Sequence, residues 1–225
     1  MEITCGPKHD LRLLSLNLPI VPRFKNDTIK NLFYKKNGIC GNDNLGVLVS
    51  GGIDSALLYF LLLEENINTG SKYNIIPYTI LRIGACDPAL AVINWIQRYF
   101  KLPLTDLNVV GNPSLEEIDQ VQSGIDDILA NNIDFLYVGV MQDRPEHYVN
   151  SYSIKFKDTY RIRYPLLNLQ KSHIIDLYMQ KNIIELLSYT SSCDVGYHRD
   201  KEPCGQCNGC GAKQWALDQL GYRIP

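Results

Sequence analysis

A short loop near residue 50 has the residue types that phosphate binding requires. It reads Ser50-Gly51-Gly52-Ile53-Asp54-Ser55 and lies where a continuous apolar run at residues 45–50 ends. Adjacent glycines let the backbone approach an anion closely, and the N–H groups at the start of a following helix point toward it. The two serine hydroxyls add donors, and Asp54 could hold Mg²⁺. The loop therefore predicts phosphate binding, although it lacks the Gly-Lys-Ser/Thr of a Walker loop. The alternative is a tight strand-to-helix turn that Asp54 or Ser55 caps.

Four cysteines toward the other end of the sequence have the spacing of a metal site: Cys193, Cys204, Cys207 and Cys210. Four thiolates form the closed tetrahedral shell of structural zinc, and Gly205 and Gly209 permit the tight turns that such a shell needs. Two alternatives stay open. The cluster could hold an iron–sulfur centre, or His198 could replace one of the thiolates.

The composition limits the classes of protein to which the chain can belong. Its 225 residues are 45% hydrophobic and 20% charged, which excludes wholesale disorder. The net charge of −2 argues against a strongly basic nucleic-acid wrapper. No apolar run reaches the roughly 18 residues of a membrane-spanning helix, and residues 1–10 do not resemble a secretory signal. Seven cysteines, an odd number with four clustered, fit a reducing compartment. We therefore expect a cytoplasmic protein without a membrane partner.

From residue 45 onward the sequence predicts alternating strands and helices. Short apolar runs typical of buried strands occupy residues 45–50, 74–81, 104–110 and 133–140. Longer segments typical of core-facing helices occupy residues 55–66, 88–101 and 116–132. This alternation predicts a doubly wound α/β fold with a parallel sheet. Further along we expect a hairpin at 151–165, one or two helices within 170–188 and a last helix near 211–220.

The loop at Ser50–Ser55, in its strand–loop–helix context, resembles the pyrophosphate loop of the PP-loop ATP pyrophosphatase superfamily. Together with the cysteine cluster, it resembles the 7-cyano-7-deazaguanine synthase family. Further segments match that family's motifs: Gly139-Val140 with Asp143, Pro165-Leu166-x2-Leu169-x-Lys171, Thr190 with Ser192-Cys193, and Cys204-Gly205-x-Cys207-x2-Cys210. The resemblance spans residues 45–222. It implies a PP-loop, adenine nucleotide alpha hydrolase-like sheet with a C-terminal four-cysteine zinc-binding subdomain.

This resemblance also implies a reaction. ATP would activate the carboxylate of 7-carboxy-7-deazaguanine, ammonia would attack to give the amide, and further ATP would drive dehydration to the nitrile. A carboxylate oxygen is a poor leaving group until it carries a phosphoryl or adenylyl group. Positioned donors and Mg²⁺ would disperse the charge that develops during transfer.

The resemblance assigns roles to single residues. The ATP phosphates would lie against the loop residues Ser50, Gly51, Gly52, Asp54 and Ser55. The catalytic set would be Asp54, Ser55 and Lys171, and the adenine would be bordered by Tyr78, Thr79 and Arg82. A guanine-like edge presents adjacent N–H and NH₂ donors that carboxylates can accept, so the base would be bound by Asp143 and Glu146. Zn²⁺ would occupy the four cysteines.

Three parts of the chain follow from these expectations. Residues 1–44 would form an N-terminal arm, residues 45–188 the PP-loop nucleotide-binding α/β domain, and residues 189–225 the zinc-binding segment with its helix. The expected small-molecule partners are the deazaguanine acid and ammonia or another amine. A homodimer, and a protein or nucleic-acid partner at residues 1–44, are open expectations.

Departures from the family keep other functions open. The arm is extra, the family's Gln-Arg-His stretch is here Leu81-Arg82-Ile83, and its Tyr-Pro-Asp-Cys-Arg loop is here residues 144–148. One alternative is therefore an enzyme that passes an activated deazaguanine-type carboxylate to an amine on a protein or nucleic acid. A tRNA-thiolating enzyme would need Cys86 as its reactive cysteine. A zinc-ribbon nucleic-acid module without catalysis would use the basic side chains of alternating residues at 155–163.

Overall fold

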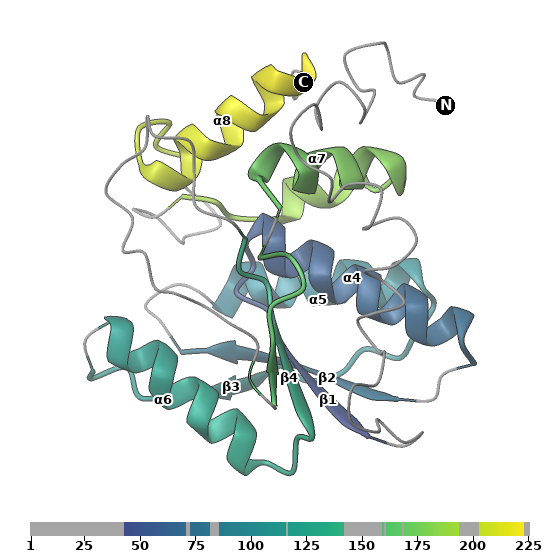
Figure 1. Cartoon of the computed structure of the whole chain (residues 1–225), viewed down its shortest axis with the longest axis vertical. Coiled ribbons are helices and arrows are strands. Elements are labelled where there is room, and N and C mark those ends of the chain that lie inside the picture. Colours follow the sequence, from purple (N-terminus) through teal and green to yellow (C-terminus); the bar gives the residue numbers. More distant parts are fainter. Residues whose placement is uncertain are drawn as a thin grey trace.

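The computed structural model describes residues 43–70, 73–81, 86–115, 117–141, 159, 161–167, 169–193 and 203–222. Almost all of the expected arm at residues 1–44 lies outside the described residues. The same holds for Arg82, Asp143 and Glu146, for His198 and for most of the expected hairpin at 151–165. Within the described ranges, one sheet is covered by helices on both faces (Figure 1).

Five parallel strands form the sheet: β1 (Asn44–Leu48), β2 (Asn74–Ile80), β3 (Asn108–Val110), β4 (Phe135–Val138) and β5 (Ile162–Arg163). Their order is β3-β2-β1-β4-β5, and every neighbouring pair is parallel. The chain thus builds outward from β1 through β2 and β3, and then continues on the other side with β4. Ligands of such sheets bind where the order reverses, at the carboxyl ends of the strands. Here that place lies beyond β1 and β4, and the predicted doubly wound α/β fold is confirmed.

The helices are α4 (Ile53–Asn68), α5 (Cys86–Tyr99), α6 (Glu117–Ala130), α7 (Lys171–Gln180) and α8 (Asn208–Leu220), with a 3₁₀ helix, η4 (Ile184–Tyr189). Figure 1 shows α4 and α5 on one face of the sheet, with α7 and α8 stacked outside them, and α6 alone on the other face. None of the described helices combines the length and apolar character that crossing a bilayer requires.

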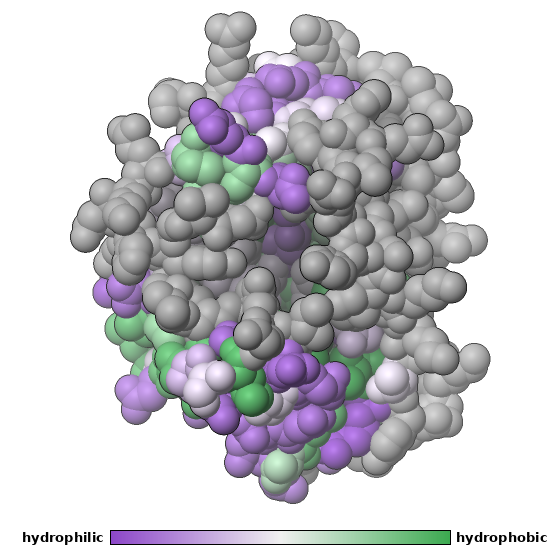
Figure 2. All heavy atoms as spheres, turned by 90° about the vertical axis from the view of Figure 1, so that its left-hand side faces the viewer, coloured by the Kyte–Doolittle hydropathy of each residue, from purple (hydrophilic) through white to green (hydrophobic). Residues whose placement is uncertain are grey.

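The central strands β1 and β4 are apolar, apart from Asn44 at the start of β1, because both of their faces are buried. Val47 and Tyr137 belong to the large core beneath α4, α5, α7 and α8, whereas Leu48 and Leu136 belong to a smaller core beneath α6. In α6, Ile125 and Ile128 face this smaller core, and the outward positions are polar. The surface over α6 accordingly mixes hydrophilic and hydrophobic residues, at the lower end of Figure 2. Fully buried strands explain why the sequence shows continuous apolar runs rather than alternation.

Element boundaries differ from the expected ones at the edge of the sheet and at the start of α4. Residues 104–106 are exposed and only Asn108–Val110 pair with β2, because β3 is an edge strand. The first helix begins at Ile53 rather than residue 55, with Gly52 as its N-cap. β5 pairs in parallel with β4. With these boundaries, the predicted phosphate loop at Ser50–Ser55 lies directly between β1 and the first turn of α4.

Candidate functional site

The loop between β1 and α4 can follow its path only because residue 51 is glycine. Gly51 has φ +79°, a region that other residues rarely adopt. A Cβ there would also lie 2.6 Å from Pro88 and 2.7 Å from the backbone of Ala89, at the start of α5. Gly139, just beyond β4, is similarly constrained, since its Cβ would lie 2.9 Å from the backbone of Ser55. The ends of β1 and β4 and the starts of α4 and α5 therefore meet tightly around this loop.

Ser55 organises the loop from within. Its Oγ accepts a hydrogen bond from the Ser50 N–H at 3.1 Å, lies 3.1 Å from the Ser50 Oγ and donates to the Gly52 carbonyl at 3.1 Å. Ser55 is buried whereas Ser50 is exposed. Within the described residues, the N–H groups of Ile53 and Asp54 have no hydrogen-bond partner, as is usual in the first turn of a helix. These N–H donors, with the Ser50 hydroxyl, are groups that could bind an anion, and phosphate binding by the loop stays a prediction.

Asp54 and Lys171 meet although 117 residues separate them. The Lys171 Nζ lies 2.6 Å from Asp54 Oδ2, and Lys171 is the first residue of α7. The second oxygen, Oδ1, is buried without a hydrogen-bond partner in the part of the chain that the structure describes. A carboxylate oxygen without a partner beside a helix start suits coordination of Mg²⁺ next to a phosphate. The structure thus brings two of the three expected catalytic side chains into contact and places Ser55 beside them.

Tyr78 and Thr79 lie at the end of β2, next to the loop. The Tyr78 carbonyl accepts the Val49 N–H at 2.7 Å, and burial raises the pKa of the Tyr78 hydroxyl. The Thr79 Oγ1 is buried and has no partner among the described residues. Their roles at adenine stay predictions, as does that of Arg82. The base-binding roles of Asp143 and Glu146 also fall outside the described residues.

Two contacts of this loop involve residues that sequence reasoning missed. The Ser191 N–H donates to the Gly51 carbonyl at 2.9 Å, which fastens the segment leading to Cys193 onto the phosphate loop. The Tyr178 hydroxyl donates to the Ile53 carbonyl at 2.7 Å and is completely buried, so its pKa is well above the ordinary value. Ser191 stands between motif residues that the resemblance had identified. No local signal marks Tyr178, because its contact spans 125 residues.

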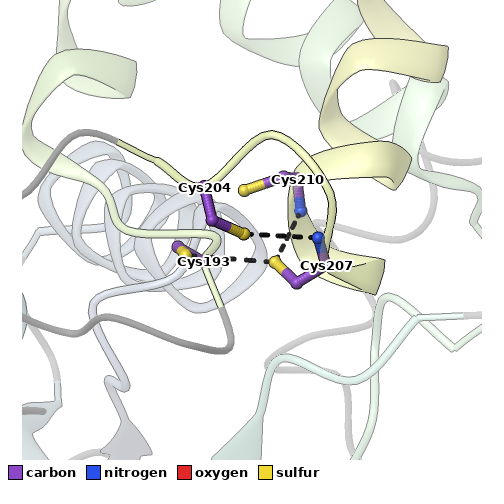
Figure 3. A group of neighbouring side chains, drawn as sticks. All are labelled: Cys193, Cys204, Cys207 and Cys210. Atoms are coloured by element: carbon purple, nitrogen blue, oxygen red, sulfur yellow. Dashed lines mark hydrogen bonds between the residues drawn. The ribbon is translucent and has the colours of Figure 1, made fainter.

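The four cysteines converge from two segments, and their thiols point toward one another (Figure 3). All four Sγ atoms lie within 4.8 Å of one another. Cys207 is the N-cap of α8, and its Sγ lies 3.9 Å from that of Cys193. The Cys207 N–H donates to the Cys204 Sγ, and the Cys210 N–H donates to the Cys207 Sγ. A tetrahedral centre with metal–sulfur bonds of about 2.3 Å needs sulfur–sulfur distances of about 3.8 Å. The spacing of the four thiols therefore fits tetrahedral coordination of one metal ion.

The electrostatics of the cluster also favour a cation. Burial raises the pKa of the Cys210 thiol to about 12, and hydrogen bonds with Cys207 and Cys193 act in the same direction. Several neighbouring thiolates repel one another, so full ionisation requires a positive centre. The cluster can bind a metal, as expected from the cysteine spacing.

Comparisons with known proteins find one family model that matches part of the chain and solved structures with a similar fold. The model of the family "Queuosine biosynthesis protein QueC" matches residues 142–221. No curated protein matches the sequence. NMN synthetase from Francisella tularensis has a similar structure, with a TM-score of 0.52, 10% identity, and coverage of 91% of this chain and 88% of that one. The U34-tRNA thiolase NcsA from Methanococcus maripaludis, solved with its [4Fe-4S] cluster, has a TM-score of 0.48, 15% identity, and coverage of 89% and 73%.

The family match covers Lys171, Ser191 and the complete cysteine cluster, and so includes the segment fastened to the phosphate loop. The structural likeness supports the doubly wound α/β fold. Over residues 142–221, this chain is accordingly QueC-like.

Proposed function

We propose that this protein uses ATP and Mg²⁺ to activate the carboxylate of 7-carboxy-7-deazaguanine, and that it converts the activated acid with ammonia to the amide and then to the nitrile. The observation that carries this proposal is the contact between Lys171 and Asp54. It joins a QueC-like motif to the Ser50–Ser55 loop, so the two halves of the resemblance meet at one site.

The loop suits the charge changes of carboxylate activation. One substrate carboxylate oxygen attacks a phosphorus atom of ATP, the bond to the leaving phosphate oxygen breaks, and the leaving group gains negative charge. N–H groups at the start of α4 and the Lys171 ammonium are donors fixed in advance for that charge. Mg²⁺, held by Asp54, would neutralise the phosphates further. Ammonia then attacks the carbonyl carbon, loses a proton and expels the phosphorylated or adenylylated oxygen.

We assign zinc to the cysteine cluster. Sulfur atoms within 4.8 Å of one another fit four ligands of a single ion. An iron–sulfur cluster holds its thiolates on different iron atoms, and its ligands therefore lie further apart. Four thiolates leave zinc no open position, so its role here is structural, and we place no reaction step there. Metal analysis of purified protein tests this assignment: one zinc per chain without acid-labile sulfide supports it.

Product analysis tests the proposed reaction. Zinc-replete protein is incubated with Mg·ATP, 7-carboxy-7-deazaguanine and ammonia, and the products are separated by mass spectrometry. The proposal expects the nitrile, formed only when all components are present. Asp54→Asn protein provides the matched control without product. Failure of the wild type to consume ATP under these conditions would overturn the proposal.

A second function, transfer of the activated acid to another amine, is favoured by the sequence differences at residues 81–83 and 144–148. In this case the same assay stalls at an adenylate or amide, and an amine acceptor recognised by residues 1–44 would complete the reaction. Labelled acid that becomes attached to a macromolecule only when this acceptor is present would identify it.

The remaining two alternatives receive less support. Thiolation would need a reactive Cys86, but burial and the neighbouring Asp87 raise the pKa of its thiol, which disfavours the thiolate. A nucleic-acid strip at residues 155–163 would need free cations. Arg161 donates to the Leu129 and Ile133 carbonyls, and Arg163 donates to the Thr159 carbonyl. Two of its basic side chains thus serve the fold.

A further inference from the structure

The peptide bond between Gly51 and Gly52 is oriented from outside the phosphate loop. Glycine backbones meet few steric limits, so this peptide could rotate if no other group held it. The Gly51 carbonyl accepts the Ser191 N–H at 2.9 Å. Because the C=O and N–H groups of a trans peptide point in opposite directions, this bond turns the Gly52 N–H to the other side, where its nitrogen lies 3.4 Å from the Ser50 Oγ. Ser191 therefore holds one backbone donor of the loop beside the Ser50 hydroxyl.

The segment that contains Ser191 is short and is anchored on both sides. Before it, the Thr190 N–H and hydroxyl both donate to the Leu187 carbonyl in η4. After it, Ser192 alone separates Ser191 from Cys193, whose side chain is buried in the cysteine cluster. A shift of Cys193 would therefore move the N–H group that holds the loop.

The cysteines at the start of α8 belong to a part of the fold that is already fixed relative to the loop. Cys207 and Cys210 begin this helix, which packs against α7 (Figure 1). The first residue of α7, Lys171, is paired with Asp54 in the loop. The Cys207 Sγ lies 3.9 Å from that of Cys193, a weak contact between thiols (Figure 3). Bonds from all four sulfurs to one metal ion would instead tie Cys193 firmly to the start of α8.

We infer that Ser191 is a positioning residue of the phosphate loop, and that a metal ion at the four cysteines raises the affinity of this loop for Mg·ATP through it. The inference deepens the proposed function and rests on it, because it assumes that the loop binds a nucleotide. With the ion bound, Cys193 and Ser191 keep the Gly51–Gly52 peptide turned so that its N–H serves the phosphates. The ion takes no part in the reaction, but it controls the geometry of a donor.

Coupling between the metal centre and the phosphate loop must act in both directions. If the metal ion raises the affinity for Mg·ATP by a certain factor, Mg·ATP raises the affinity for the metal ion by the same factor. The competing role of the ion is to stabilise only α8 and its surroundings, in which case the two affinities are independent. Measuring metal affinity with and without nucleotide separates the two roles without requiring metal-free protein.

Equilibrium competition for zinc tests the coupling on the full-length protein. Zinc-loaded protein is mixed with a chromophoric chelator that has little affinity for Mg²⁺, and the zinc that each retains is measured with and without saturating Mg·ATP. We expect Mg·ATP to raise the zinc affinity of the wild type about three- to tenfold, the range of one well-placed hydrogen bond. ATP that binds free zinc would change the result in the opposite direction, so it cannot mimic this gain.

Ser191→Pro removes the N–H that the Gly51 carbonyl accepts. The preceding residue, Thr190, has φ −93° and ψ 147°, the extended backbone that a residue before proline adopts. We expect Ser191→Pro to bind Mg·ATP about three- to tenfold more weakly in calorimetry, and to show no gain in zinc affinity when Mg·ATP is saturating. Ser191→Ala keeps the N–H and should behave like the wild type in both measurements.

A pair of cysteine variants tests the same link without altering Ser191. Cys193→Ser and Cys204→Ser each leave three thiols for zinc, but only Cys193→Ser detaches the segment that contains Ser191. Mg·ATP should therefore raise the zinc affinity of Cys204→Ser and leave that of Cys193→Ser unchanged.

Three results would overturn the inference: a wild-type zinc affinity that saturating Mg·ATP does not change, a gain in Ser191→Pro equal to that of the wild type, or equal gains in the two cysteine variants. Circular dichroism melting shows which variants are folded, and the cysteine pair decides the case if Ser191→Pro is not. If the wild type itself gave no heat of binding with Mg·ATP, the proposed function would fail first, so the two failures are distinguishable.

Discussion

At the scale of single residues, the contact between Asp54 and Lys171 gives the clearest support for the proposed site. Each side chain comes from the first turn of a helix, and each lies in a motif of the QueC-like resemblance. A second ion pair joins Glu64 of α4 to Lys181, the residue just after α7, and both side chains are about a quarter exposed. One pair therefore lies at the phosphate loop and the other provides a structural comparison.

We predict that Asp54→Asn lowers kcat/KM at least about 100-fold, because the variant loses both the charge that holds Mg²⁺ and the anionic partner of Lys171. Glu64→Gln removes a comparable ion pair between α4 and the residue just after α7 and should leave kcat/KM within about twofold of the wild type. Steady-state kinetics of both variants provides the measurement. Equal losses in the two variants would mean that the ion pairs serve only to hold the helices together.

His173 gives a prediction about stability. Its Nδ1 accepts the Gln170 N–H, its Nε2 is buried with no partner among the described residues, and burial lowers its pKa below 6.5. The unfolded chain therefore binds a proton near pH 6.5 that the folded chain binds only at lower pH. The neutral imidazole contributes stability above pH 6.5, and this contribution is lost as the pH falls through the lower, folded pKa.

The expected slope in that range is at most about 1.4 kcal/mol per pH unit for one histidine. We predict that His173→Gln has a shallower dependence of the free energy of unfolding on pH just below pH 6.5 than the wild type. Urea unfolding of both proteins at a series of pH values measures the difference. Parallel curves would contradict the buried neutral state of His173.

At the scale of elements, the phosphate loop depends on backbone geometry that only glycine permits. We predict that Gly51→Ala abolishes Mg·ATP binding, because its φ is +79° and its Cβ would collide with Pro88. Gly70→Ala is the matched control: its φ is +89°, but no atom lies within 4 Å of the added Cβ. It should cost about 1–2 kcal/mol of stability and leave nucleotide affinity intact. Calorimetry and thermal melting separate the two effects, and normal Mg·ATP binding by Gly51→Ala would refute this account of the loop.

The cysteine cluster should support α8 and the segment that leads to it. Removal of the metal by a chelator is predicted to lower the unfolding midpoint by at least about 5 °C, because a tightly bound ion stabilises only the folded state. Differential scanning calorimetry before chelation, after chelation and after return of zinc measures the effect. A midpoint that chelation does not change would show that the cluster carries no structural ion.

At the scale of the whole molecule, periodicity and burial explain what could be predicted from the sequence. The runs that became β1 and β4 are apolar on both faces, apart from Asn44 at the start of β1, because the sheet is covered on both faces, and this pattern indicated the doubly wound fold. The cysteine spacing likewise predicted the convergence of four thiols. The extent of β3 could not be predicted, since its short pairing depends on its place at the sheet edge.

The features of the site that could not be predicted from the sequence depend on long-range contacts. Motifs pointed to Asp54 and Lys171 separately, but only the folded chain joins them. The Ser191 contact with Gly51 depends on how the segment before Cys193 packs against the loop that precedes α4, which no local pattern encodes. Asp143, Glu146 and Arg82 remain predictions because they lie outside the described residues.

The most direct test of whether the loop after β1 binds a nucleotide is calorimetric titration with Mg·ATP. Metal-replete wild-type protein and the Asp54→Ala variant are titrated side by side. We predict one Mg·ATP bound per wild-type chain and an affinity at least about tenfold weaker in Asp54→Ala. No heat of binding in the wild type, or the same affinity in both proteins, would contradict the account.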